Sequence, residues 1–305
     1  MQNDNVQIRH IKRFCELTIY RHAIILAHNY QSAEVQDIAD YVGDSLELSI
    51  KAASTDAQVI VFCGVSFMAE TAAILSPKKK VLIPDMKAGC HLADMIDVEQ
   101  LKELKKKHPQ AKVLSYVNTS ADVKAISDLC CTSANAVEAV QKLSKDAKEI
   151  IFVPDKHLAH YASAEANCPL IIWNGYCSVH MKISARDVLS QKKRHPQAKV
   201  IVHPECNSSV VAQADEVIST GRMCKYAKKS KHKEMIVGTD IGMLYRLRKE
   251  NPTKLFYSAS GKAICADMRL ITLEKILYSL QEMEYEVKVD KEIALKAKGA
   301  IEKML

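Results

Sequence analysis

Short runs of apolar residues recur along the chain, and between them apolar residues follow the wider spacing of amphipathic helices. This alternation favours parallel strands joined by helices over a sandwich of antiparallel sheets. We predict strands at nine of these runs: Ala23–Ala27, Val59–Cys63, Val81–Ile83, Val113–Tyr116, Ile150–Val153, Leu170–Ile172, Val200–Val202, Met235–Val237 and Lys254–Tyr257.

The predicted strands fall into three sets of three because the sequence repeats itself. The hexapeptide HPQAKV occurs at His108–Val113 and again, 87 residues later, at His195–Val200. A shift of 88 residues aligns Ala33–Asp40 with Ala121–Asp128, with matching Ala, Val, Ile and Asp, and Asp215 continues the Asp column. The register is therefore kept across whole units and is not confined to one shared hexapeptide.

Polar residues just after the predicted strands share this register. They form three columns, which are His28, Tyr116 and His203, then Tyr30, Asn118 and Glu205, then Ser45, Ser133 and Thr220. Open parallel sheets bind ligands at the carboxyl ends of their strands, so three such units would direct these groups to one cavity. We expect the three hydroxyl residues to cap helix N-termini, where free N–H groups can bind an anion.

We therefore predict an α/β fold of three homologous α/β repeats with small parallel sheets around a pseudo-threefold axis. The active site is expected at their junction. The predicted repeats span residues 1–92, 93–180 and 181–268, and C-terminal helices at 269–305 are expected to complete the first repeat.

Composition and charge narrow the class of protein. The 305 residues are 48% hydrophobic and 26% charged, the balance of an ordinary globular protein, and no apolar run is long enough to cross a membrane. The polar start at Met1–His10 does not resemble a signal peptide, so we expect a cytoplasmic protein without a membrane partner. The net charge of +7 suits anionic substrates, and the basic run Lys225–Lys233 is interpreted as surface and not as a nucleic-acid site.

Three of the ten cysteines share the repeat register. Cys90 and Cys177 are 87 residues apart, and Cys177 and Cys265 are 88 apart. Three thiolates from three loops can hold zinc or three irons of a cubane cluster, and no CxxC pair typical of zinc sites is present. An iron without a protein thiolate is a Lewis acid, which favours dehydration or condensation chemistry.

Acid–base groups are expected at the same cavity. Glu205 is the best candidate for a general base, and we expect burial to raise its pKa. Tyr30 is a second candidate for proton transfer. The alternatives at this point are an iron–sulfur sensor or scaffold, a structural zinc protein and an aconitase-like hydro-lyase.

Strings along nearly the whole chain resemble the quinolinate synthase family. They include AHNYQ (Ala27–Gln31), DIADYVGDSL (Asp37–Leu46), GVSFMAE (Gly64–Glu70), PDMKAGC (Pro84–Cys90), YVNTSADVK (Tyr116–Lys124), CTSANAVE (Cys131–Glu138), WNGYCSVH (Trp173–His180), VHPEC (Val202–Cys206) and GTDIGM (Gly238–Met243). Two positions depart from the family pattern, Ser178 where many members have Pro and Asp267 where Asn is expected.

The resemblance implies one [4Fe–4S] cluster per chain, held by Cys90, Cys177 and Cys265. It implies condensation of iminoaspartate with dihydroxyacetone phosphate to quinolinate in de novo NAD biosynthesis, with L-aspartate oxidase or aspartate dehydrogenase as a candidate functional partner. The implied catalytic residues are Tyr30, His203 and Glu205. The implied substrate-binding residues are His28, Ser45, Tyr116, Val117, Asn118, Ser133, His203, Pro204, Glu205 and Thr220.

Overall fold

Three four-stranded sheets form the framework of the computed structural model, which describes residues 13–305. The first sheet has the order β2-β1-β3-β4, the second β6-β5-β7-β8 and the third β10-β9-β11-β12, and all strand pairs are parallel. The strands are β1 (Ala23–His28), β2 (Tyr41–Gly43), β3 (Val59–Cys63), β4 (Lys80–Leu82), β5 (Lys112–Tyr116), β6 (Leu129–Cys131), β7 (Ile150–Val153), β8 (Ile171–Ile172), β9 (Lys199–Val202), β10 (Glu216–Val217), β11 (Glu234–Gly238) and β12 (Leu255–Ser258).

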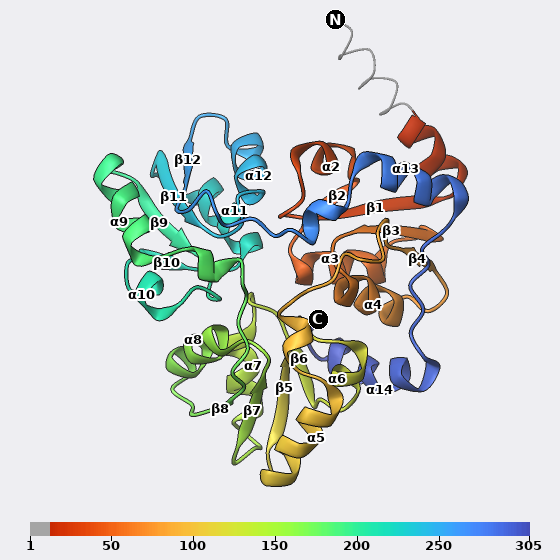
Figure 1. Cartoon of the computed structure of the whole chain (residues 1–305), viewed down its shortest axis with the longest axis horizontal. Helices are drawn as coiled ribbons and strands as arrows, with labels where there is room; N and C mark the ends of the chain where they lie inside the picture. Colours follow the sequence, from red (N-terminus) through yellow and green to blue (C-terminus); the bar gives the residue numbers. More distant parts are fainter. Residues whose placement is uncertain (1–12) are drawn as a thin grey trace, which may run out of the picture.

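Helices alternate with these strands, and the three sheets with their helices are called the first, second and third units below. Figure 1 shows the units as three lobes around a common centre, which confirms the predicted α/β class and its threefold repetition. The α-helices that lie wholly within the described residues are α2 (Ala33–Ile38), α3 (Ser45–Ser54), α4 (Ser66–Leu75), α5 (Val98–Lys107), α6 (Ala121–Ala125), α7 (Ala136–Leu143), α8 (Lys156–Ala166), α9 (Ala185–Arg194), α10 (Ser208–Val211), α11 (Thr220–Lys229), α12 (Met243–Glu250), α13 (Leu273–Glu282) and α14 (Lys291–Glu302). Three 3-10 helices are η1 (Ala93–Met95), η2 (His180–Lys182) and η3 (Met268–Leu270).

Each of the nine predicted strands is present, with ends that differ by no more than about one residue. The fourth strand of each sheet, β2, β6 or β10, was not predicted. These strands contain no run of three aliphatic residues, whereas the equally short β4 and β8 lie in the apolar runs Val81–Ile83 and Leu170–Ile172.

The repeated aspartate explains how each short strand is attached. Asp40, Asp128 and Asp215 immediately precede β2, β6 and β10, and each lies beside the neighbouring strand, which is β1, β5 or β9. The Oδ2 atom of each accepts a hydrogen bond from a backbone N–H of that strand, over 2.7 Å from Ile25, 2.8 Å from Val113 and 2.8 Å from Val200. Each aspartate side chain thus adds one hydrogen bond to the sheet immediately before the backbone pairing of the short strand begins.

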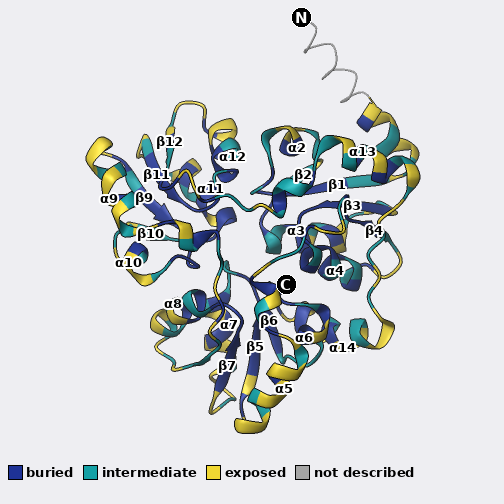
Figure 2. Cartoon of the chain, viewed as in Figure 1, coloured by how far each residue is buried: buried dark blue, intermediate teal, exposed yellow. Residues whose placement is uncertain are grey.

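The cores lie along the central strands. Figure 2 shows the strands largely buried and the outward faces of the helices exposed. One hydrophobic cluster joins the first and second units and includes residues of α13 and α14, whereas the third unit is filled by two clusters of its own. Helix α13 packs on β3, and α14 packs against α6, β6 and α4, so the C-terminal segment connects two units.

The basic run Lys225–Lys233 lies mostly on the surface. Its first part belongs to α11, where Lys225, Lys228 and Lys229 are exposed and Ala227 is buried. This is the arrangement of an amphipathic helix, and the run lies on the surface as predicted. Within residues 13–305, no helix is both long enough and apolar enough to cross a lipid bilayer.

The aspartate contacts should contribute measurably to stability. Replacing Asp128 or Asp215 by Ala should lower the free energy of unfolding by about 1–2 kcal/mol, because a backbone N–H inside the sheet loses its acceptor. Urea unfolding measures this change. The exposed Asp146 provides the control, and Asp146→Ala should change stability by less than about 0.5 kcal/mol.

The same two carboxyl groups predict a pH dependence. Burial raises the pKa of Asp128 and of Asp215, but a backbone N–H and a neighbouring lysine lower each pKa further, so both lie below the ordinary value. Their contribution is therefore fully present above about pH 4 and is lost as the pH falls through the folded-state pKa values. A loss of stability in the Ala variants that stays constant down to pH 2 would contradict this explanation.

Candidate active site

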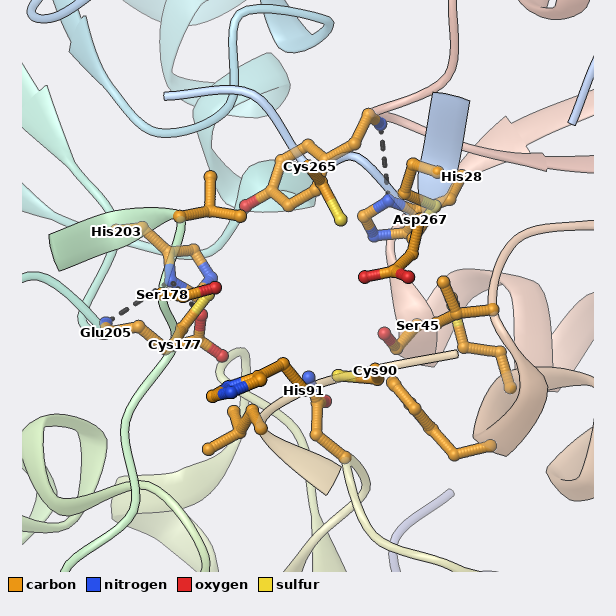
Figure 3. Close-up of a pocket in the computed structure, with 18 of the residues that line it drawn as sticks. His28, Ser45, Cys90, His91, Cys177, Ser178, His203, Glu205, Cys265 and Asp267 are labelled. Atoms are coloured by element: carbon orange, nitrogen blue, oxygen red, sulfur yellow. Dashed lines mark hydrogen bonds and ion pairs between the residues drawn. The ribbon is translucent and has the colours of Figure 1, made fainter. Parts of the chain in front are cut away.

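A cavity of about 150 Å³ lies at the junction of the three units. Residues from all three units line it, and Figure 3 shows the three repeat-related cysteines, with their sulfur atoms directed toward the same space. The site residues predicted from the sequence that line the cavity are His28, Tyr30, Ser45, Cys90, Tyr116, Asn118, Ser133, Cys177, His203, Glu205, Thr220 and Cys265. Val117 and Pro204 do not line it, and both are buried beside their strand ends.

The three cysteines occupy equivalent loops. Each lies after the last strand in the sheet order of its unit, and a 3-10 helix begins three residues later. All three thiols are free and partly buried. Burial raises the pKa of Cys90 to about 12 and that of Cys265 to about 11, whereas backbone hydrogen bonds from the following 3-10 turn act in the opposite direction. Donors of this kind favour a thiolate, so the loops suit sulfur that carries negative charge.

Buried aspartate side chains hold two of these loops. The N–H of Cys177 donates to Asp155 Oδ2 over 3.1 Å, and the N–H of Cys265 donates to Asp240 Oδ2 over 2.6 Å. Asp155 also caps α8, and it follows the end of β7. In the first unit Val65 occupies the position of these aspartates and has no carboxyl group. There the N–H of Ser66 donates to the carbonyl oxygen of Ala88 and holds the cysteine loop instead.

The two histidines in the first column share one orientation. The N–H of Tyr30 donates to His28 Nδ1 over 3.2 Å, and the N–H of Glu205 donates to His203 Nδ1 over 3.3 Å. With Nδ1 as the acceptor, the neutral ring carries its proton on Nε2. Burial lowers the pKa of His28 to about 4 and that of His203 to about 3, so both rings are neutral hydrogen-bond donors near pH 7.

A chain of polar contacts connects Tyr30 with Glu205. The Tyr30 hydroxyl lies 2.5 Å from Thr239 Oγ1, which lies 2.9 Å from His180 Nε2. On the other side of the His180 ring, Nδ1 lies 2.8 Å from Glu205 Oε2, at ion-pair distance but without the alignment of a hydrogen bond. His180 and Glu205 are almost completely buried, so the chain runs through the protein interior.

The expectation of a raised pKa for Glu205 was wrong. Burial acts in that direction, but His203, His180 and the hydroxyl of Tyr116 lower the pKa of Glu205 to about 2. Glu205 is therefore a carboxylate near pH 7, and polar side chains surround it, among them the Tyr116 hydroxyl as a hydrogen-bond donor. The ligand atoms of Cys177, His180 and Glu205 lie within 4.8 Å of one another, close enough for a metal ion to bind among them.

The three hydroxyl residues do not cap helices as expected. The N-caps are Asp44 for α3, Asn135 for α7 and Ser219 for α11, so Ser45 and Thr220 are the first helical residues and Ser133 precedes its cap by two. Their hydroxyl groups are therefore available to the cavity. Ser133 Oγ lies 3.0 Å from His203 Nε2.

Asn29 and Asp44 support these hydroxyl groups from the interior. Asn29 Nδ2 donates to Thr220 Oγ1 over 2.9 Å, and Arg246 donates to the Asn29 side-chain oxygen over 2.7 Å. Asp44 accepts the N–H of Gly221 over 3.2 Å and also caps its own helix, so it links the first and third units. In the second unit, the buried Oδ1 of Asn118 has no hydrogen-bond partner among the described residues, so it can accept a hydrogen bond from a bound substrate.

Sequence reasoning missed His180, Thr239, Asn29 and Asp44. The repeat register could not identify His180, because the equivalent positions are Ala93 and Met268. Asn29 lies inside the AHNYQ string, between two residues that were selected. Thr239 follows the end of β11, so its position at a strand end is a signal that could have found it.

A glycine brings the third unit close to the first. A Cβ atom at Gly242 would lie 2.5 Å from the carbonyl oxygen of Tyr30 and 2.9 Å from that of Gln31. The Gly242 carbonyl in turn accepts a hydrogen bond from Gln36 over 3.1 Å. This contact holds the backbone of Tyr30 against the loop that follows Thr239.

Comparison with known proteins gives one consistent match. A family model described as quinolinate synthetase A protein matches residues 9–305. Quinolinate synthase of Dehalococcoides mccartyi strain CBDB1 is 56% identical over 293 residues, which cover 96% of both chains. Quinolinate synthase 1 of Methanosarcina acetivorans is 52% identical over 97% of this chain and 96% of the relative. Quinolinate synthase of Thermodesulfovibrio yellowstonii is 51% identical over 97% of this chain and 98% of the relative.

The close contact at Gly242 generates a prediction. Gly242→Ala should destabilise the protein by about 1–3 kcal/mol, because the added methyl group would press on the backbone of Tyr30 and Gln31. Thermal or urea unfolding measures the effect. Gly261→Ala is the matched control, since no heavy atom lies within 4 Å of a Cβ atom at that position. Equal stability of the two variants would show that the contact at Gly242 is not tight.

Proposed function

Because the chain belongs to the quinolinate synthetase A protein family, we propose that it is a quinolinate synthase that acts in NAD biosynthesis in the cytoplasm. The reaction is the condensation of iminoaspartate with dihydroxyacetone phosphate to quinolinate, with loss of phosphate and two waters. The observation that carries the proposal is that one free cysteine from each unit faces the cavity that Glu205 and Tyr30 also line.

The cavity residues fit a [4Fe–4S] cluster held by Cys90, Cys177 and Cys265. The charge of Cys265 affects the pKa of Cys90, and the charge of Cys90 affects that of Cys177, so the three sulfur atoms are electrostatic neighbours. Backbone donors from the three 3-10 turns would stabilise the ligating thiolates. When bound, such a cluster supplies one iron without a protein thiolate, which acts as a Lewis acid toward substrate oxygen.

Neutral donors around the cavity suit the anionic groups of both substrates. His28 and His203 carry protons on Nε2, and the hydroxyl groups of Ser45, Ser133 and Thr220 lie at or near helix N-termini. Such donors bind phosphate and carboxylate without an additional buried charge. Tyr116 and Asn118 complete the wall in the second unit, and Val117 and Pro204 support it as buried neighbours.

Glu205 and Tyr30 are proposed to handle the protons of the condensation, together with His203 at the cavity wall. Burial raises the pKa of Tyr30 well above its ordinary value, so the phenol is protonated near pH 7. The contacts through Thr239 and His180 link this phenol to the Glu205 carboxylate. Tyr30 is thus placed to donate a proton to a leaving hydroxyl group, and the Glu205 carboxylate to accept a proton that the substrate releases.

The supply of iminoaspartate requires a second reaction, because this compound is an oxidised form of aspartate. We propose L-aspartate oxidase or aspartate dehydrogenase as the functional partner that produces it.

All ten cysteines of this chain are free, as expected for a protein that works in a reducing compartment.

The ligand assignment predicts the behaviour of four cysteine variants. Anaerobically prepared Cys90→Ser, Cys177→Ser and Cys265→Ser proteins should each lose the cluster and quinolinate formation, because one thiolate ligand is missing. Cys15→Ser is the control, since Cys15 is exposed and lies outside the cavity, and it should retain both. Iron analysis and the visible absorption spectrum report the cluster. Full iron content in any of the first three variants would refute the assignment.

A second prediction separates catalysis from cluster binding. Glu205→Gln keeps the shape of the side chain but cannot accept a proton, so quinolinate formation should fall by roughly 10²–10⁴-fold with iron content unchanged. Tyr30→Phe should behave similarly because it removes the proposed proton donor. Glu138→Gln, on the exposed face of α7, is the control and should retain activity. Near-normal turnover by Glu205→Gln would show that its carboxylate is only structural.

A further inference from the structure

A fully buried lysine lies where the first and second units meet. Lys124, in α6, has no exposed surface, and among residues 13–305 it is the only lysine or arginine in the buried class. Its Nζ donates to the carbonyl oxygen of Thr119 and lies 5.4 Å from the ring centre of Phe67, a residue that lines the active-site cavity. Burying an ammonium group costs free energy unless the charge is hydrogen-bonded and interacts with negative charge nearby.

The hydrogen bond to Thr119 holds a turn of the cavity wall. Thr119 Oγ1 donates to the carbonyl oxygen of Tyr116 over 3.0 Å, and it also lies 3.0 Å from Ser115 Oγ. Tyr116 and Asn118, on the same turn, both line the cavity. Through this hydrogen bond Lys124 holds Tyr116 and Asn118, two residues of the proposed substrate site, in position.

The repeat shows that this hydrogen bond does not require a charge. A shift of 88 residues aligns Lys124 with Gln36 and Thr119 with Gln31. In the first unit, Gln36 Nε2 donates to the Gln31 carbonyl oxygen over 2.9 Å, the same contact made by a neutral amide. The positive charge at Lys124 therefore needs a separate explanation.

The groups near Lys124 carry a negative charge or can acquire one by losing a proton. Glu70, in α4, interacts with the Lys124 charge, and its Oε2 accepts the N–H of Ala121 over 3.0 Å. Burial lowers the pKa of Lys124, but Glu70, Cys130 and Cys90 act in the opposite direction. Cys90, one of the three proposed cluster ligands, is therefore among the groups that interact electrostatically with Lys124.

We propose that Lys124 positions the Tyr116–Thr119 turn and also supplies a fixed positive charge that stabilises the anionic cluster at its Cys90 side. Glu70 offsets part of this charge. The inference rests on the proposed function, because it assigns Lys124 a role toward the cluster. It makes Lys124 a positioning and electrostatic residue and not a group that touches substrate.

The midpoint potential of the cluster tests the electrostatic role. Reduction adds negative charge, so a nearby positive charge favours the reduced cluster. Lys124→Gln keeps a hydrogen-bond donor and removes the charge, and it should shift the potential to more negative values. Glu70→Gln keeps an acceptor for Ala121, and it should shift the potential to more positive values. The double variant should lie close to the wild-type value, because the two charges are removed together.

Opposite shifts of the midpoint potential in the two single variants cannot arise from a general loss of structure. If Lys124→Gln folds poorly, Glu70→Gln still gives an independent result. Lys142→Gln, an exposed lysine on α7, is the control and should leave the potential unchanged. Unchanged potentials, or shifts of the same sign in both single variants, would overturn the electrostatic role. A wild-type chain that takes up no cluster would instead contradict the proposed function itself.

Lys124→Met tests the positioning role, because it removes both the donor and the charge. Its KM should rise above that of Lys124→Gln, since only the Gln variant can still hold the Thr119 carbonyl in place. Equal KM values for the two variants would show that the turn does not depend on this hydrogen bond.

Discussion

Polar groups that are buried where three sheets meet must find partners inside the protein, and most of the site geometry follows from how these partners are supplied. Backbone N–H groups orient the rings of His28 and His203. Asp155 and Asp240 accept the N–H groups of two cysteine loops. The cavity is therefore built from donors and acceptors that are already fixed before any ligand binds, and such preorganised groups stabilise charge that develops in a transition state.

Threefold repetition places these groups, and divergence between the repeats gives them different chemistry. The cysteine is the same in all three units, whereas the following 3-10 turn carries Ala93, His180 or Met268 at its first position. Only His180 can connect Thr239 with Glu205. The position of Lys124 shows the same logic, because Gln36 makes the equivalent hydrogen bond without a charge.

The fold and the cavity could largely be predicted from the sequence because both depend on features that recur. Apolar runs identified nine strands, and the register brought together the polar columns and the cysteines that line the cavity. The short strands β2, β6 and β10 contain no run of three aliphatic residues, unlike the runs that identified the equally short β4 and β8. The predicted direction of the Glu205 pKa was wrong because His203, His180 and Tyr116 together outweigh burial, and the repeat register identified only two of these three residues. Helix caps shifted by one or two residues because Asp44 and Ser219 compete as caps with the hydroxyl residues beside them.

Anaerobic metal and sulfide analysis of the wild-type chain tests the central claim most directly, namely that three repeat-related cysteines hold an iron–sulfur cluster at the junction. The account predicts about four irons and four sulfides per chain, with absorption that bleaches in air as the iron without a protein thiolate is attacked. Stoichiometric zinc, with no iron after anaerobic reconstitution, would contradict it.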